Sequence, residues 1–224
     1  MLSPEVEELA EIVRIPSPAP APQAVAFDGE HLWVGSWETE HVYGIDAHQG
    51  RVFEDAAAPG KPVGATVAGD ELFFVLSEAG DSRFIRRFVP GHGFKMKNGQ
   101  QCPDDTGSFL AFDGSRLWLS QRHNKRVLKL SPSGGVERSF EIGHEIIGLS
   151  WVDERLYLSL WLGATNGGCR IAYIEPAKTA AESEPAVRYV AQSPFAAISL
   201  TRDGDRFWTS DYRANALVAF TIPR

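Results

Sequence analysis

The nine residues AFDGEHLWV (residues 26–34) occur again as AFDGSRLWL (residues 111–119), with six of the nine letters unchanged. Three weaker copies keep the order of a turn followed by an apolar, an aromatic and a third strand-forming residue: VAGDELFFV (67–75), WVDERLYLS (151–159) and TRDGDRFWTS (201–210). Similarity of this kind at a regular spacing is the sequence signature of a repeat architecture. The chain is therefore expected to build one structural unit five times.

Each copy predicts a hairpin of two buried strands. Asp-Gly or Gly-Asp between apolar runs indicates a tight turn, because both residues tolerate the positive φ angles that hairpin turns require. An aromatic residue between aliphatic or β-branched neighbours is typical of a strand buried on both faces. The first apolar residue after the turn recurs at intervals of about 40 to 50 residues, at Leu32, Leu72, Leu117, Leu156 and Phe207.

Two further strands follow most hairpins. A third run is present in every unit, as HVYGID, RFIRRF, RVLKLS, RIAYIE and ALVAFT. A fourth is present in only four units, as RVFED, FKMK, VERSFEI and AVRYVA, and the fifth unit lacks it because the chain stops after ALVAFTIPR. The segment AEIVRIP (residues 10–16), which precedes a Pro-rich linker (16–22), can supply the missing strand.

These units predict an all-β fold in which residues 1–224 form a single five-bladed β-propeller domain. Each blade has four antiparallel strands, and the N-terminal strand closes the last blade, which removes two exposed sheet edges. An irregular β-sandwich is the alternative, but it leaves the regular spacing unexplained. The apolar residues of PEVEELAEIV (4–13) also fit a short helix before the first strand.

Composition excludes several classes of protein. The net charge is −7 and no Lys/Arg-rich run is present, so nucleic acid is not an expected partner. No apolar run approaches the ~18 residues of a membrane-spanning helix. The acidic start MLSPEVEELAEIV does not resemble a secretory signal, so we expect a cytoplasmic protein. We also expect a monomer. Cys102 and Cys169 are expected to be free thiols, with one disulfide as the alternative.

Three stretches resemble the glutamine cyclotransferase family of the plant and bacterial type. EIVRIPSPAPAPQAVAFDG is similar to the opening of that family, and Gln23 stands at its Gln position. GIDAHQGRV resembles its Asp-x-x-Thr-Gly-x-Val strand end, and WVDERLYLSLW is close to its Trp-Val-Asp-Gly-x-Leu-Tyr segment, with Trp161 retained. The resemblance spans nearly the whole chain and implies a five-bladed propeller.

The positions that the family uses for chemistry are replaced. Val63 stands where the acid/base Glu is expected, and Ser108 stands where a Trp binds substrate. Gly148 and Ser150 replace two carboxylates, and Asp211 replaces a Lys. Because proton transfer needs a positioned carboxylate or a comparable base, we expect no cyclotransferase activity.

Candidate site residues lie in the loops that gather at one rim of a propeller channel. Aromatic and polar groups there predict a ligand site, at Trp37, Glu38, Asn124, Trp161, Asp211, Tyr212 and Arg213. His144, Glu145 and His123 are the candidates for acid/base catalysis, although GHEIIG is not a zinc-binding H-E-x-x-H motif. No cofactor is expected, apart from a possible Ca²⁺ held by Glu38, Asp104 or Asp211.

Three functions therefore compete. The leading hypothesis is a pocket at the central rim that binds a small molecule or a peptide end, without cyclotransferase chemistry. The second is a lyase or hydrolase that uses the His and Glu residues as acid and base. The third is a protein-interaction scaffold, for which GFKMKNGQQCPDD (93–105) and WLGATNGG (161–168) are the loops of interest.

Overall fold

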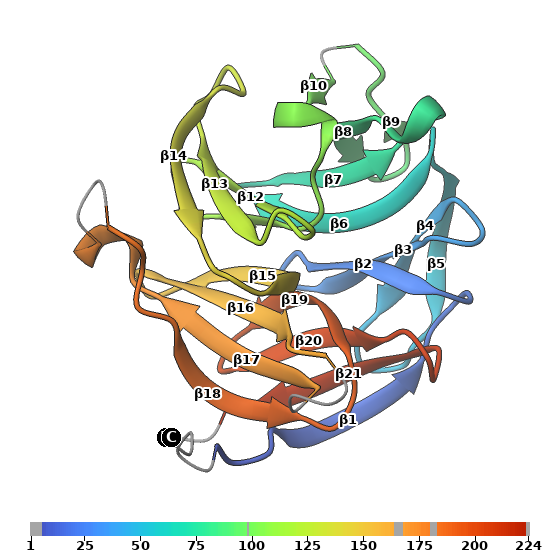
Figure 1. Cartoon of the computed structure of the whole chain (residues 1–224). Coiled ribbons are helices and arrows are strands. Elements are labelled where there is room, and N and C mark those ends of the chain that lie inside the picture. The colour runs from blue at the N-terminus through green and yellow to red at the C-terminus, as the bar shows by residue number, and fades with distance from the viewer. Residues whose placement is uncertain (1–5, 98, 164–167, 180–182, 223–224) are drawn as a thin grey trace.

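The protein is a five-bladed β-propeller. The structure, a computed structural model, describes residues 6–97, 99–163, 168–179 and 183–222. Its strands form five antiparallel sheets arranged around a central axis (Figure 1). The predicted fold class is therefore confirmed, and the β-sandwich alternative is wrong.

Blades one, three and four follow the predicted pattern of consecutive antiparallel strands. Blade one consists of β2 (Pro22–Phe27), β3 (His31–Ser36), β4 (His41–Asp46) and β5 (Val52–Ala57). Blade three consists of β11 (Leu110–Phe112), β12 (Leu117–Gln121), β13 (Arg126–Leu130) and β14 (Val136–Glu141). Blade four consists of β15 (Glu145–Val152), β16 (Arg155–Trp161), β17 (Cys169–Ile174) and β18 (Arg188–Ser193).

Blade five is closed by the N-terminal strand, as the sequence predicts. Its strands are β19 (Ala197–Asp203), β20 (Arg206–Asp211), β21 (Ala216–Thr221) and β1 (Ala10–Pro16). Figure 1 shows β1, in blue, beside β21, in red, and their register runs from Ala10 opposite Thr221 to Pro16 opposite Ala216. The helix alternative is wrong for the described part of 4–13, because Glu8 forms a parallel bridge to Gln192 and a strand begins at Ala10.

Blade two departs from the prediction at its outer edge. Its inner strands are β6 (Lys61–Ala68), β7 (Glu71–Ser77) and β8 (Arg83–Val89). The fourth strand is not continuous along FKMK but is split into β9 (Gly93–Phe94) and β10 (Gln100–Gln101), both paired with β8.

The split edge of blade two is occupied by a buried arginine. Arg86 forms an ion pair with Glu78 and donates a hydrogen bond from Nη1 to the Met96 carbonyl, at 2.9 Å. A Cβ at position 99 would overlap the Arg86 guanidinium, so only glycine fits there. The chain leaves the sheet between β9 and β10 because a buried charge needs these partners.

Short 3₁₀ turns complete the described elements: η1 (Ala79–Asp81), η2 (Pro103–Asp105) and η4 (Pro176–Lys178). Among the residues described, no helix has the length or apolar character of a membrane-crossing segment.

The innermost strands close into a ring. β2, β6, β11, β15 and β19 each contact the innermost strand of the blade on either side. The approach is close, because a Cβ at Gly64 would overlap the carbonyl oxygen of Ser108 in the next blade, and one at Gly148 would lie 2.8 Å from the Ser199 backbone. Small residues therefore set the width of the channel.

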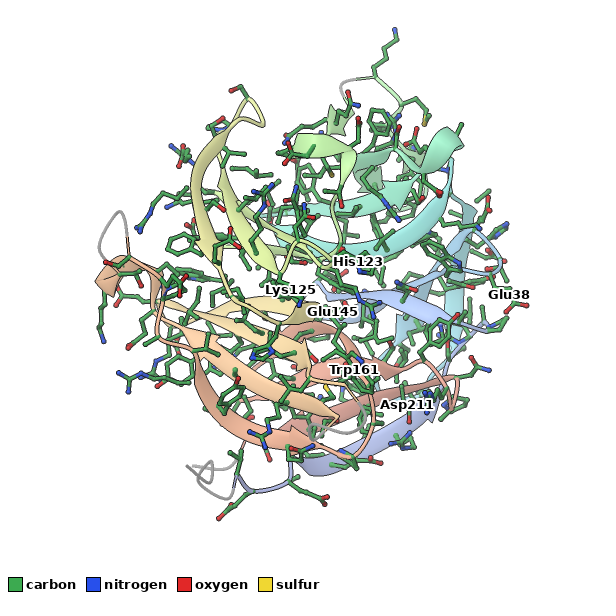
Figure 2. All side chains as sticks on the ribbon, viewed as in Figure 1. Glu38, His123, Lys125, Glu145, Trp161 and Asp211 are labelled. Carbon is green, nitrogen blue, oxygen red and sulfur yellow. The ribbon has the colours of Figure 1, made fainter. Side chains whose placement is uncertain are left out.

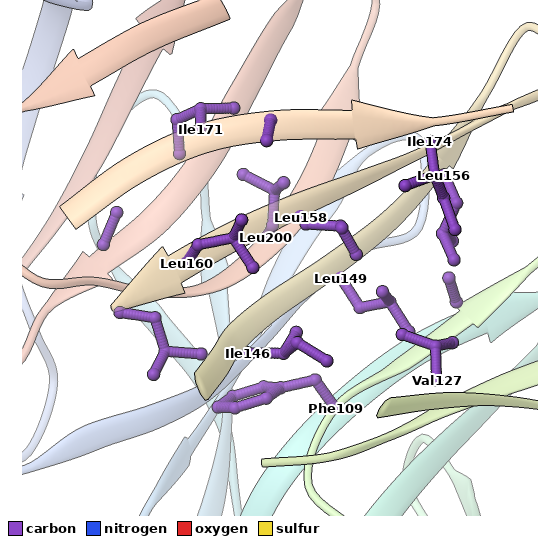
Figure 3. Close-up of a cluster of buried hydrophobic side chains, with 14 of the residues drawn as sticks. Phe109, Val127, Ile146, Leu149, Leu156, Leu158, Leu160, Ile171, Ile174 and Leu200 are labelled. Atoms are coloured by element: carbon purple, nitrogen blue, oxygen red, sulfur yellow. The ribbon is translucent and has the colours of Figure 1, made fainter. Parts of the chain in front are cut away.

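The core lies between the blades. Figure 3 shows its largest cluster, where Ile146 and Leu149 of β15 face Phe109 and Val127 of blade three. Aromatic residues of the repeated unit contribute the largest buried side chains, including Trp33, Trp118 and Trp208. Burial of such rings is a dominant contribution to stability in a sheet protein.

Candidate functional site

One end of the channel gathers the predicted site residues. In each blade the loop between the second and third strands emerges at the end where the connection from the preceding blade arrives, because neighbouring strands are antiparallel. We call this end the loop face. All ten predicted catalytic and ligand-binding residues belong to these loops or to the strand ends beside them.

A cavity of about 550 Å³ opens on the loop face between blades three and four. We call it the rim cavity. Its lining residues are Lys125, Gly143, His144, Glu145, Trp161, Leu162 and Gly163. Trp161 ends β16 directly opposite Glu145, which begins β15. Figure 2 shows Lys125, Glu145 and His123 close together near the channel axis.

Glu145 is held by an arginine on one side only. Nε and Nη2 of Arg122 both reach its Oε2 at 2.8 Å. The other carboxylate oxygen, Oε1, lies 3.8 Å from Nδ1 of His123, which is too long for a hydrogen bond. Within the described residues, the Oε1 oxygen of Glu145 therefore stays available to a donor from outside the chain.

Lys125 is placed by a strained turn. Its φ of 56° lies in the left-handed region, and its carbonyl accepts hydrogen bonds from the amides of Ile142, at 2.8 Å, and Gly143, at 3.3 Å. These bonds tie the β12–β13 turn to the connection that leads into β15. Within the described residues the Lys125 ammonium has no ion-pair partner, so its charge is uncompensated at the cavity.

His144 lines the cavity as a neutral group at neutral pH. Burial lowers the pKa of His144 below its usual value, and the positive charge of Lys125 lowers it further. A neutral imidazole can accept a proton or a hydrogen bond. His144 and Glu145 therefore share a cavity, while His123 lies beside Glu145 with its side chain 79% exposed.

Trp37, Glu38 and Asn124 lie on the loop face but do not line the rim cavity. Trp37 stands between two cations, with Lys61 Nζ 5.0 Å and the Arg83 guanidinium 5.7 Å from the ring centre. Glu38 is exposed and lies at the periphery of Figure 2. Asn124 donates to Oε1 of Gln121 at 3.1 Å, which stabilises its turn.

Asp211, Tyr212 and Arg213 belong to blade five. Asp211 accepts a hydrogen bond from Nη1 of Arg14 in β1 at 2.9 Å, and another from the Ala214 amide at 3.3 Å. Tyr212 and Arg213 are exposed. The carboxylate of Asp211 is thus engaged in holding the N-terminal strand. None of the three residues lines the rim cavity.

The three carboxylates predicted for Ca²⁺ do not form one group. Asp104 contacts Nη2 of Arg126 at 2.6 Å, and Asp211 is paired with Arg14. Across the ranges that the structure describes, no three His, Cys, Asp or Glu side chains are grouped so that they could hold a metal ion.

Four of the positions where the resemblance places a cyclotransferase's chemistry are buried and carry no carboxylate. Val63 is 5% exposed, Ser108 9% and Ser150 7%. Gly148 has no room for a side chain, because its Cβ would meet the Ser199 backbone.

Lys125 is the cavity residue that the sequence reasoning missed. It follows Asn124 in the turn QRHNKRV, and a single lysine in a polar turn ordinarily indicates a solvated loop. Its left-handed backbone conformation is one that asparagine and glycine adopt more readily. That conformation depends on the hydrogen bonds from the amides of Ile142 and Gly143, which no local sequence pattern indicates. Four residues of the loop WLGATNGG, 164–167, lie outside the described residues.

Both cysteines are free, as predicted, and both are buried. Burial raises the pKa of the Cys102 thiol to about 12, so that thiol stays protonated and unreactive at neutral pH.

No family model matches the chain, and no curated protein sequence does. Solved structures match it in fold. Glutaminyl cyclase from Myxococcus xanthus has 12% sequence identity and a TM-score of 0.74, over 98% of this chain and 99% of that one. The PQQ-bound aldose sugar dehydrogenase from Streptomyces coelicolor has 13% identity and a TM-score of 0.62, over 99% and 100%.

A third structure has a bound ligand. It is a catalytically inactive histidine-to-alanine variant of virginiamycin B lyase from Staphylococcus aureus with quinupristin, with 13% identity, a TM-score of 0.56, and coverage of 92% of this chain and 84% of that one. Identities this low establish the fold alone. The predicted likeness to a glutamine cyclotransferase propeller is confirmed for the fold.

Proposed function

We propose that the rim cavity binds a small molecule or the end of a peptide that carries a carboxylate, and that the protein has no cyclotransferase activity. The observation that carries the proposal is the convergence of an uncompensated cation, an aromatic ring and a half-engaged carboxylate in one cavity. These groups are Lys125, Trp161 and Glu145. Small-molecule sites commonly combine apolar walls with a few polar groups in a cavity of this size.

The charges favour an anionic group on the ligand. Arg122 neutralises Glu145, and burial keeps His144 neutral, so Lys125 contributes the excess charge of the cavity. A carboxylate near Lys125 would gain a charge-assisted hydrogen bond. An N–H group of the same ligand can donate to Oε1 of Glu145, and an apolar part can lie against Trp161.

The absence of cyclotransferase chemistry is supported by the residues at the positions where the family carries its carboxylates, which are buried and uncharged here. Val63, Gly148 and Ser150 offer no group that could transfer a proton.

A binding screen tests the proposal. Acetylated amino acids, dipeptides and sugar acids are screened by thermal shift and confirmed by calorimetry, each beside the matching neutral amide. We expect a carboxylate ligand to bind and its amide to bind at least about tenfold more weakly. Lys125→Met should lose this preference, whereas Lys178→Met, which changes an exposed lysine paired with Glu175 in blade four, should keep it. Equal binding by wild type and Lys125→Met contradicts the proposal.

Catalysis is a second candidate, because the neutral His144 and the carboxylate of Glu145 line the same cavity. A lyase shares this fold, and its histidine-to-alanine variant is inactive. Ligands found in the screen should be incubated with the protein and analysed by mass spectrometry for elimination or hydrolysis products. Turnover that disappears in His144→Gln while binding remains supports an enzyme. Turnover that is unchanged in both His144→Gln and Glu145→Gln excludes this pair.

A further inference from the structure

A second concave surface lies at the end of the propeller opposite the loop face, between blades two and three. Two neighbouring cavities of about 260 and 480 Å³ share Glu71, Phe73, Gln100, Leu117 and Pro132. Because they share these residues, they form one elongated depression, which we call the lower groove. Its other lining includes Ile85, Arg87, Lys95, Lys97, Arg116 and Leu130.

The groove exists because the outer strand of blade two is split. The outer strand stops at Phe94, with one more backbone hydrogen bond from Lys95 to Arg87 at 2.9 Å, and resumes at Gln100. Lys95 and Lys97 lie along one wall of the groove. The opposite wall is the β13–β14 turn of blade three. Gly134 in that turn leaves room for the Gln100 amide, because a Cβ there would come within 2.5 Å of it.

The floor and the walls of the groove differ in character. Phe73 and Leu117 are half-buried and apolar, and Met96 beside the groove is 54% exposed. The Nε2 group of Gln100 is buried and has no hydrogen-bond partner in the described structure. Such a donor costs free energy unless it is satisfied, so it favours an occupant that brings an acceptor.

The groove carries excess positive charge on an acidic protein. Glu71 is neutralised by Arg87 at 2.8 Å, and Arg116 is paired with Glu137 at 2.8 Å. Lys95 and Lys97 are exposed and have no ion-pair partner in the described part of the chain. Two free cations thus stand above an apolar floor in a chain of net charge −7.

We propose that the lower groove docks a short acidic segment of a partner protein in an extended conformation, with an apolar side chain on Phe73 and Leu117. Carboxylates of the segment pair with Lys95 and Lys97, and a carbonyl or carboxylate oxygen accepts from Gln100. A peptide fits better than nucleic acid, because the floor of the groove is apolar and suits an apolar side chain.

Fluorescence anisotropy with the labelled hexapeptide EDLFDE tests the proposal. QNLFNQ removes the charges and EDSGDE removes the apolar residues. We expect EDLFDE to bind at least about tenfold more tightly than either control, and its affinity to fall as salt is raised from about 50 to about 500 mM. The double variant Lys95→Glu, Lys97→Glu should lose at least about tenfold in affinity. Gln100→Ala should weaken binding by about threefold or more, since a bond to the amide is lost.

The matched control is Arg51→Glu, Lys178→Glu, which makes the same change in net charge at exposed positions outside the groove. It should bind EDLFDE as the wild type does. Amide signals of residues 71–73, 99–101 and 115–117 should shift on titration, whereas those of the rim cavity should not. Binding that is equal in both double variants, equal affinity for QNLFNQ, or tighter binding of a single-stranded oligonucleotide overturns the proposal. A failure here leaves the rim cavity untouched, because the two sites share no residue.

Discussion

At the scale of single residues, the repeated sequence unit is explained by one hydrogen-bonded pair. In three blades an Asp at the hairpin turn accepts a hydrogen bond from the indole N–H of the Trp five positions later. The pairs are Asp28 with Trp33 at 2.7 Å, Asp113 with Trp118 at 3.0 Å, and Asp203 with Trp208 at 3.0 Å. The pair fixes the turn and satisfies a donor in the core, so both residues recur together.

Replacing Asp113 by Asn should lower the free energy of unfolding by about 1 to 3 kcal/mol at pH 7, because a charged acceptor of several hydrogen bonds is lost. Burial alone would raise the pKa of Asp113, but bonds from Trp118, Arg116 and Ser115 outweigh it and lower the pKa to about 2. The folded-state pKa lies below the unfolded value of 3.8, so the ionised group stabilises the fold above about pH 4.

That contribution is lost as the pH falls from about 4 to about 2. Urea unfolding at pH 7 and at about pH 2.5 should therefore give a smaller difference between wild type and Asp113→Asn at the lower pH. The control is Asp70→Asn, in the exposed turn of blade two, which should change stability by less than about 0.5 kcal/mol. A difference between Asp113→Asn and wild type that does not depend on pH would contradict the role of the charge.

At the scale of elements, the N-terminal strand is the piece that completes the propeller. β1 covers the edge of β21, and Arg14 binds both Glu11 and Asp211. Residues 7–9 also reach blade four through two backbone hydrogen bonds. The Leu9 N–H donates to the Gln192 backbone carbonyl at 2.9 Å, and the Gln192 backbone N–H donates to the Glu7 carbonyl at 2.8 Å. The N-terminal segment therefore fastens two blades together.

Deleting residues 1–16 should lower the free energy of unfolding by about 3 to 5 kcal/mol, because the β1–β21 ladder contributes about 0.5 to 1.5 kcal/mol per hydrogen bond. The exposed edge of β21 should also promote association, which light scattering after gel filtration would detect. A synthetic peptide of residues 6–18 should restore the urea midpoint, whereas the same peptide with Val13→Pro should not. Unchanged stability of the truncated chain would show that β1 is dispensable.

Strands of blades five and two also show where the sequence is informative about elements. The bounds of β1 and β21 follow from apolar runs with clear ends, so AEIVRIP and ALVAFT match the structure. FKMK does not, because the course of the chain there depends on the contacts of Arg86 in the preceding strand β8, which the pattern of FKMK itself does not reveal. The lower groove is a product of that tertiary effect.

At the scale of the whole molecule, the sequence predicted the propeller but only part of the candidate site. The fold could be predicted because five copies of one hairpin leave a periodic record. The rim cavity unites His144, Glu145 and Trp161, whose loops topology brings to one face. Topology did not reveal that Asp211 would pair with Arg14 of the N-terminal strand, because that is a side-chain contact within blade five. It also did not reveal that Lys125 would join the cavity, because its placement depends on backbone hydrogen bonds to the connection between blades three and four.

The closed ring of inner strands makes the five blades one cooperative unit, and Gly64 tests this. A methyl group at Gly64 would overlap the Ser108 carbonyl of the next blade, so Gly64→Ala must push two inner strands apart. We expect the free energy of unfolding of Gly64→Ala to fall by about 1 to 3 kcal/mol or more, as at other overpacked sites. Gly135→Ala is the control, because its methyl group would meet only the Ser131 hydroxyl at an ordinary 3.4 Å.

Because the ring is continuous, fluorescence and circular dichroism should show one urea transition that moves as a whole in Gly64→Ala. Two separate transitions would mean that blades two and three unfold independently of the rest, and the ring would then contribute less to stability than its contacts indicate.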